Sequence, residues 1–130
     1  NIQGDLVNSG NLFALSSSAG QNQALISAAN IVNQQNAVIS SILPSAYNFS
    51  GTSSVVENLN LTLFALNNIV NAGTISSSGE LNMIAGASLI NSGSVLSSGA
   101  GNLNFSLANI VNTGSLMSAA GSVNINSSVS

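Results

Sequence analysis

Residues 69–73 read Ile69-Val70-Asn71-Ala72-Gly73: two aliphatic residues, then an asparagine, a small residue and a glycine. The phrase returns at residues 6–10, 89–93 and 110–114, and a degenerate copy without the glycine stands at residues 31–35. In the last three copies the asparagine holds positions 71, 91 and 112, so successive copies are 20 and 21 residues apart. A repeat near 20 residues is typical of a solenoid, in which no single coil can bury its apolar face alone.

Between these phrases the chain alternates apolar and polar residues. Leu81 and Met83 would lie on one face of a strand, and so would Leu103 and Phe105, because successive side chains of a strand point to opposite faces. The glycines recur where the backbone has to turn, for which we expect a positive φ. The sequence thus predicts an all-β fold, a parallel β-helix (β-solenoid) of about six coils of roughly 20 residues. It would form a single domain over residues 1–130.

One interval breaks the period. From Asn33 to Asn71 the chain takes 38 residues, and the excess contains the only proline, Pro44. Because proline cannot donate to a strand ladder, we expect an irregular insertion over about residues 36–56. Its apolar side chains either fold back onto their own coil or make a lateral contact to another molecule. The candidates for that contact are Ile42, Leu43, Tyr47 and Phe49.

The repeated phrase also predicts which side chains superimpose. Stacked asparagines can hydrogen-bond amide to amide along the axis, as in cross-β ladders, or each can simply favour its own turn. The expected ladder consists of Asn8, Asn33, Asn71, Asn91 and Asn112. The expected turn glycines are Gly10, Gly73, Gly93 and Gly114.

The doubled aliphatics leave two interpretations open. Strict alternation would turn one residue of each pair, such as Ile69-Val70, outward into an exposed stripe that can stick to a neighbour. Corner geometry could instead bury both, because bulges break alternation.

Composition excludes several functions. The chain is 45% hydrophobic and 2% charged, and it has no Lys, Arg, His or Cys. Without basic residues nothing neutralises phosphates, so we expect no nucleic-acid partner. No disulfide or thiolate metal site can form, and no apolar run approaches the roughly 18 residues of a membrane helix. Asp5, Glu57 and Glu80 are scattered and lack a base or nucleophile beside them, so we expect no enzyme, metal site or cofactor.

So little charge suits a chain that joins other copies of itself. Residues 1–2 resemble residues 104–105 and 124–125, which are equivalent positions of the repeat. The chain thus starts and stops at about the same phase of the repeat. Neither end has the polar cap that isolated solenoids need, and uncapped edges would pair with the next copy. The sequence opens at Asn1 without a visible signal peptide, which predicts a processed product or a piece of a longer chain.

Residues 4–12 read GDLVNSGNL and residues 68–76 read NIVNAGTIS. These stretches resemble the repeats of filamentous haemagglutinin-type exoproteins, which Gram-negative bacteria export by two-partner secretion. The resemblance implies a right-handed parallel β-helix, secreted to the cell surface or beyond it, with adhesion, biofilm or contact functions. The chain departs from that family in having no recognisable secretion domain and almost no charge on the repeats.

These observations predict a non-catalytic structural protein, a β-solenoid subunit that stacks end to end into an extracellular bacterial filament or matrix fibre, with lateral bundling of the filaments. An alternative is the rigid shaft of a secreted adhesin, whose partner would be a host or cell-surface receptor. A third is a cross-β functional amyloid, in which strands stack between chains without an intramolecular coil.

Overall fold

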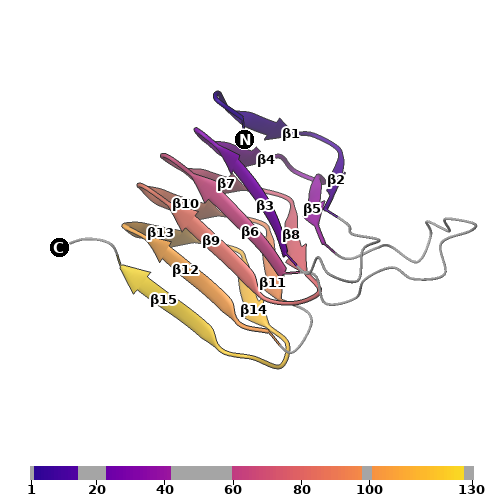
Figure 1. The fold of residues 1–130 in the computed structure, drawn as a ribbon, viewed down its shortest axis with the longest axis vertical. Coiled ribbons are helices and arrows are strands. Elements are labelled where there is room, and N and C mark those ends of the chain that lie inside the picture. The colour runs from indigo at the N-terminus through magenta and orange to yellow at the C-terminus, as the bar shows by residue number, and fades with distance from the viewer. Residues whose placement is uncertain (1, 15–22, 42–59, 98–100, 128–130) are drawn as a thin grey trace, which may run out of the picture.

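The structure is a computed structural model that describes residues 2–14, 23–41, 60–97 and 101–127. In these residues all of the regular secondary structure is β-strand, and every strand pairs in parallel with its neighbours. The strands stack layer upon layer around a common interior (Figure 1). This confirms the predicted all-β parallel β-helix.

Three sheets of five strands each form the walls of the solenoid. Sheet A carries the repeated phrase and consists of β1 (Leu6–Asn8), β4 (Ile31–Asn33), β7 (Ile69–Asn71), β10 (Ser88–Asn91) and β13 (Asn109–Asn112). Sheet B consists of β2 (Asn11–Phe13), β5 (Val38–Ser40), β8 (Thr74–Ser77), β11 (Ser94–Ser97) and β14 (Ser115–Ser118). Sheet C consists of β3 (Gln23–Ala28), β6 (Asn60–Ala65), β9 (Leu81–Ala85), β12 (Leu103–Leu107) and β15 (Val123–Ser127).

The chain visits the sheets in the order A, B, C, so each coil contributes one strand to every wall. The described strands make five coils, one fewer than the six expected from a uniform repeat. The first coils are longer than the later ones. Asn8 and Asn33 are separated by 25 residues, and Asn33 and Asn71 by 38. The same chain length therefore builds fewer layers.

The prediction of an insertion over residues 36–56 is wrong at its start. Residues 38–40 form β5, which pairs with β2 on one side and β8 on the other. The turn before β5 spans residues 34–37, whereas the turn before β8 spans only residues 72–73. Asn36 accommodates the wider turn with a φ of 67°, a left-handed conformation that asparagine tolerates better than most residues. The rest of the predicted insertion, residues 42–56, lies outside the described residues.

Alternation along each strand fills the interior. In β9 the side chains of Leu81 and Met83 are fully buried, while the alternate residues Asn82 and Ile84 are partly exposed. Interior positions of successive coils superimpose into apolar columns, and each buried Leu or Ile contributes roughly 1.5–3 kcal/mol. The column of sheet A is Leu6, Ile31, Ile69, Leu89 and Ile110. The column of sheet B is Leu12, Ile39, Ile75, Val95 and Leu116.

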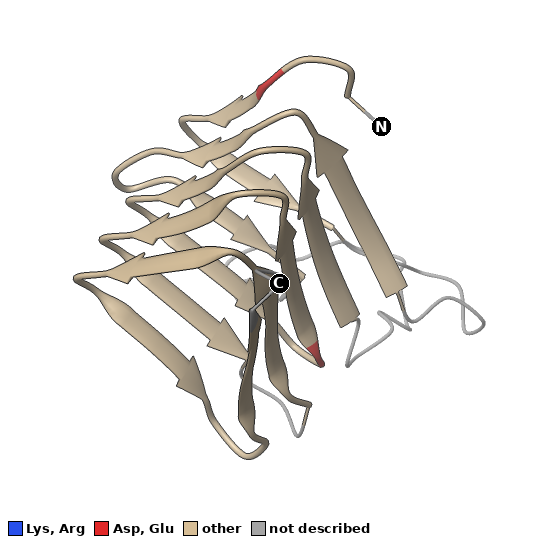
Figure 2. Ribbon diagram, turned by 90° about the vertical axis from the view of Figure 1, so that its left-hand side faces the viewer, with Lys and Arg blue, Asp and Glu red and all other residues tan. Residues whose placement is uncertain are grey.

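The outer surface is almost without charge. Figure 2 shows acidic positions at isolated turns of an otherwise uncharged ribbon. The described carboxylates each accept a hydrogen bond from an asparagine amide of a neighbouring coil, Asp5 from Asn30 at 2.8 Å and Glu80 from Asn104 at 3.0 Å. Among the described residues no helix is long and apolar enough to cross a membrane.

Candidate functional site

The five recurrent asparagines form one hydrogen-bonded row at the corner where sheet A turns into sheet B. The Nδ2 of each of the first four donates to the Oδ1 of the asparagine one coil further along the chain. The donor–acceptor distances are 2.9, 2.9, 2.8 and 2.8 Å in chain order. We call this row the corner ladder, and its members are Asn8, Asn33, Asn71, Asn91 and Asn112.

Each corner-ladder amide also holds the turn that follows it. Besides its bond to the next asparagine, Asn71 Nδ2 lies 3.2 Å from the Gly73 carbonyl of its own coil and 3.0 Å from the Ser94 carbonyl of the next coil, so its two N–H groups are shared among three acceptors. Asn33 and Asn91 repeat both contacts. The axial ladder and the turn-forming role of asparagine, two interpretations that the sequence left open, are therefore both present in the same side chain.

The inner asparagines of the corner ladder are buried, so their polar atoms need hydrogen-bond partners within the protein. Asn33 and Asn71 have no exposed surface, and Asn91 is 1% exposed. No buried side-chain nitrogen or oxygen in the described ranges lacks a hydrogen-bond partner. If a buried amide lost one of these partners, the free energy of unfolding would fall by about 1–3 kcal/mol. This loss favours asparagine over other residues at the buried positions of the ladder.

Three of the four turn glycines, Gly73, Gly93 and Gly114, are required by close packing between coils and not by a positive φ. A Cβ added to Gly93 would overlap the carbonyl oxygen of Gly73 in the preceding coil, and one on Gly114 would overlap that of Gly93. None of the four predicted turn glycines has a φ in the left-handed region, so that expectation is wrong. Gly10, in the first described coil, has no described atom within 4 Å of such a Cβ.

A second buried polar row lies at the corner between sheets B and C, and sequence reasoning missed it. Ser97 is fully buried, and its Oγ lies 2.6 Å from the Gly79 carbonyl and 3.0 Å from the Gly101 carbonyl, the two acceptors available to its single proton. Ser77 and Ser118 occupy the same position in the neighbouring coils. Each of these serines stands six residues after a corner-ladder asparagine, and this constant offset was the available signal.

A third row runs along the outer face of sheet C. Asn124 donates to Asn104 Oδ1 and Asn104 donates to Asn82 Oδ1, both at 2.8 Å, and Asn82 reaches the Thr62 hydroxyl at 3.4 Å. We call these four residues the surface column. Its asparagines are partly buried or exposed, and the spacing of 20 to 22 residues would have predicted them.

The doubled aliphatics form an outward stripe on sheet A. In each pair the first residue points to the interior, as Ile69 and Leu89 do with no exposed surface. The second residue faces outward, and Ile90 and Val111 are 42% and 53% exposed. The stripe is aligned by strand register and consists of Val7, Val32, Val70, Ile90 and Val111.

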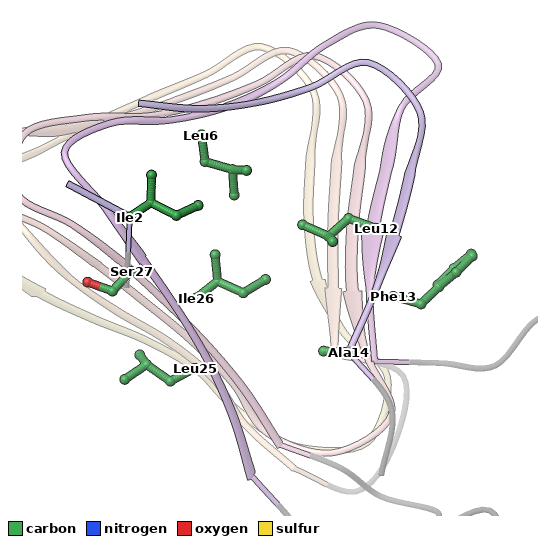
Figure 3. A pocket seen from close by; sticks show the side chains of 8 residues that line it. All are labelled: Ile2, Leu6, Leu12, Phe13, Ala14, Leu25, Ile26 and Ser27. Carbon is green, nitrogen blue, oxygen red and sulfur yellow. The ribbon is translucent and has the colours of Figure 1, made fainter. Parts of the chain in front are cut away.

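The N-terminal rim of the solenoid is open. The strands β1, β2 and β3 are the edge strands of the three sheets at this end. Residues 2–4 cover a short part of that edge, since the Ile2 amide donates to the Ser27 carbonyl and the Ala29 amide to the Gly4 carbonyl, both at 2.8 Å. Apolar side chains at the rim surround a hollow of about 270 Å³ (Figure 3). Its lining is Ile2, Leu6, Leu12, Phe13, Ala14, Leu25, Ile26 and Ser27.

The C-terminal rim is open as well. Here β13, β14 and β15 are the edge strands. Val123 and Ile125, which continue interior columns of sheet C, are 44% and 59% exposed. Within the described residues, the Nδ2 of Asn112 makes no hydrogen bond, while its Oδ1 accepts from Asn91 and from the Gly114 amide. Within the described residues, both ends of the stack thus consist of edge strands and exposed apolar side chains.

Some predicted residues lie outside the described part of the chain. They are Glu57 and the candidates for lateral contact, Ile42, Leu43, Tyr47 and Phe49. Among the residues that are described, no three His, Cys, Asp or Glu side chains come together into a set that could hold a metal ion. Among the described residues, the candidates for a functional role are therefore the two rims, the polar rows and the aliphatic stripe.

In comparisons with known proteins, no family model, no curated protein and no solved structure matches this chain.

Proposed function

We propose that this chain is a non-catalytic structural protein whose solenoid stacks end to end on other copies to build an extracellular filament or matrix fibre. The two rims carry the proposal. Unpaired strand edges are a template for pairing with another chain, and monomeric proteins normally blunt them with charge, proline or a covering element. Solenoids that stay single need polar caps for the same reason.

The side chains at the rims support the same conclusion. A free N-terminal rim leaves Leu6, Leu12 and Ile26 around a solvent-filled hollow, and a free C-terminal rim leaves Val123 and Ile125 exposed. Covering such apolar surface contributes roughly 25 cal/mol per Å². Pairing of the rims would satisfy the backbone edges and remove this surface from water in one step.

The composition fits an assembled state. With a formal net charge of −3 and no basic residue, copies of the chain repel each other weakly. The absence of His, Lys and Cys from the sequence leaves no activated base or nucleophile, which supports a non-catalytic role. The resemblance of the repeated phrase to secreted haemagglutinin-type repeats supports an extracellular bacterial location.

Electron microscopy of the purified chain over a range of concentrations tests this proposal. We expect unbranched filaments with an axial repeat of about 24 Å, because five layers at about 4.8 Å each make one copy. A monodisperse rod that never elongates would contradict it.

That second outcome would favour the rigid shaft of an adhesin. The register of the apolar columns suits further coils of the same chain as well as a second copy, and a shaft would present its receptor-binding surface elsewhere. Cross-β amyloid without an intramolecular coil does not fit the fold, because each wall is built from consecutive coils of one chain.

A further inference from the structure

The corner ladder has a direction. In all four of its links the Nδ2 belongs to the earlier coil and the Oδ1 to the later one. The ladder therefore begins with an acceptor, the Oδ1 of Asn8, and ends with a donor, the Nδ2 of Asn112.

Two backbone carbonyls lock this direction at each of the first four asparagines. The Nδ2 of Asn8 also donates to the Gly10 carbonyl at 3.0 Å and the Val38 carbonyl at 2.9 Å. A rotated amide would place its oxygen against both carbonyl oxygens, and none of the three could donate. The orientation thus cannot reverse at one of these coils without exchanging two hydrogen bonds to backbone carbonyls for contacts between acceptor oxygens.

The two ends of the ladder are consequently different. At the N-terminal rim Asn8 presents its Oδ1, whose bond within the described residues is a 3.3 Å contact from the Gly10 amide. At the C-terminal rim Asn112 presents its Nδ2, which has no partner in the described ranges. One rim offers an acceptor and the other a donor, at the same corner of the solenoid.

Resting on the proposed function, we propose that copies join head to tail only, with the C-terminal rim of one copy seated on the N-terminal rim of the next and the corner ladder continuing across the junction. Asn112 Nδ2 donates to Asn8 Oδ1 of the neighbour and to the carbonyl of its Asn11, the residue in register with Val38. Two N-terminal rims would oppose acceptor to acceptor, and two C-terminal rims donor to donor. Because the two joined surfaces differ, the contact does not close at a dimer and growth continues.

The apolar columns meet in the same arrangement. The register of sheets A and B brings Ile110 onto Leu6 and Leu116 onto Leu12 of the neighbour. In sheet C, Ile125 comes to lie on the neighbour's Ile26, in the hollow shown in Figure 3. Each junction therefore repeats the contacts between adjacent coils inside one copy.

One segment has to move for this contact to form. Residues 2–4 bond the Ser27 carbonyl and the Ala29 amide, which are the groups that the end of β15 from the neighbouring copy would use. Ile2 likewise lines the hollow that Ile125 would enter. Displacement of this short segment is part of the joining step.

Rim-blocked variants test the direction. Ile26→Asp places a charge in the N-terminal hollow, and Ile125→Asp places one on the C-terminal rim. Ser92→Asp adds the same charge at an exposed turn of an inner coil and serves as the control. Circular dichroism verifies that each variant is folded, and light scattering after size exclusion gives its mass. We expect filaments from wild type and Ser92→Asp, monomers from each blocked variant alone, and a heterodimer from the two blocked variants mixed in equal amounts.

The outcomes separate this inference from the proposed function. Wild type that never elongates overturns both. Filaments from wild type together with a homodimer from either blocked variant alone overturn head-to-tail joining and leave the structural function standing. Filaments from wild type with no heterodimer from two folded blocked variants also overturn it.

A milder substitution tests the ladder itself and does not depend on the blocked variants folding. Asn112→Asp keeps an acceptor for Asn91 and for the Gly114 amide but replaces the free donor with an oxygen. Thr113→Asp adds the same charge one residue away at an exposed position and is the matched control. We expect Asn112→Asp to slow elongation at least about tenfold relative to Thr113→Asp, the factor that corresponds to one lost hydrogen bond. Equal rates would overturn the continuation of the ladder.

Discussion

The corner ladder and the surface column are chemically alike and differ in their surroundings. Both join asparagine amides of successive coils at 2.8 to 2.9 Å. The ladder is buried between two sheets, and its Nδ2 atoms bond backbone carbonyls as well. The surface column lies on the outer face of sheet C, where water reaches its amides. The two rows even run in opposite directions, since in the surface column the later coil donates.

Burial, and not the hydrogen bond alone, therefore decides how much an asparagine row contributes to the stability of the fold. A solvated amide exchanges its partner for water at little cost, whereas a buried one leaves a donor or acceptor unpaired. Four substitutions test whether burial distinguishes the two rows. The effect of each is the change in the free energy of unfolding, measured by urea denaturation.

The largest effect is expected from Asn71→Leu in the middle of the ladder. It leaves Asn33 Nδ2 without one acceptor and Asn91 Oδ1 without its axial donor. Both atoms belong to buried residues, so we expect a loss of at least about 3 kcal/mol. A loss below 1 kcal/mol, at the level of a surface site, would show that the buried row does not stabilise the stack.

Gly93→Ala tests the packing beside the ladder. Its methyl group would overlap the Gly73 carbonyl oxygen, and forcing these coils apart is expected to cost about 2 kcal/mol. Gly10→Ala is the matched control, because nothing lies within 4 Å of the added atom. Equal destabilisation by the two variants would contradict close approach between coils as the reason for glycine.

Ser97→Ala tests the second buried corner. The hydroxyl has one proton for the two nearby carbonyls, so its removal loses about one hydrogen bond, and we expect the free energy of unfolding to fall by about 1.5 kcal/mol. Ser92→Ala, at an exposed turn of the same coil, should change the stability by less than about 0.5 kcal/mol. The corner would have no special role if both variants unfolded at the same urea concentration.

Asn104→Leu makes the same replacement as Asn71→Leu, now in the surface column. It removes the bonds from Asn104 to Asn82 and Glu80 and the bond from Asn124, and all three partners can turn to water instead. We expect less than about 1 kcal/mol. A loss as large as that of Asn71→Leu would mean that exposure does not distinguish the two rows.

Much of the architecture could be predicted because it follows from local repetition. The phrase around Asn71, Asn91 and Asn112 sets the length of a coil, and alternation in the segment of Leu81 and Met83 sets which side chains point inward. The serine corner was overlooked because serine is common in this chain, so one constant offset from asparagine does not stand out. The start of the insertion was misplaced because Val38 and Ile39 enter sheet B only through pairing with β2 and β8, which local sequence does not report.

Periodicity and composition were enough to predict the parallel solenoid, the 20-residue spacing of its later coils and the near absence of surface charge. Only the tertiary structure decided that five coils form and that glycine is needed for contact between coils. It also decided that the asparagine row is locked in one direction, ending in an acceptor at Asn8 and a donor at Asn112. The physical reason is that hydrogen-bond direction and steric overlap arise between residues 20 or more positions apart, where only the stacked coils bring their atoms together.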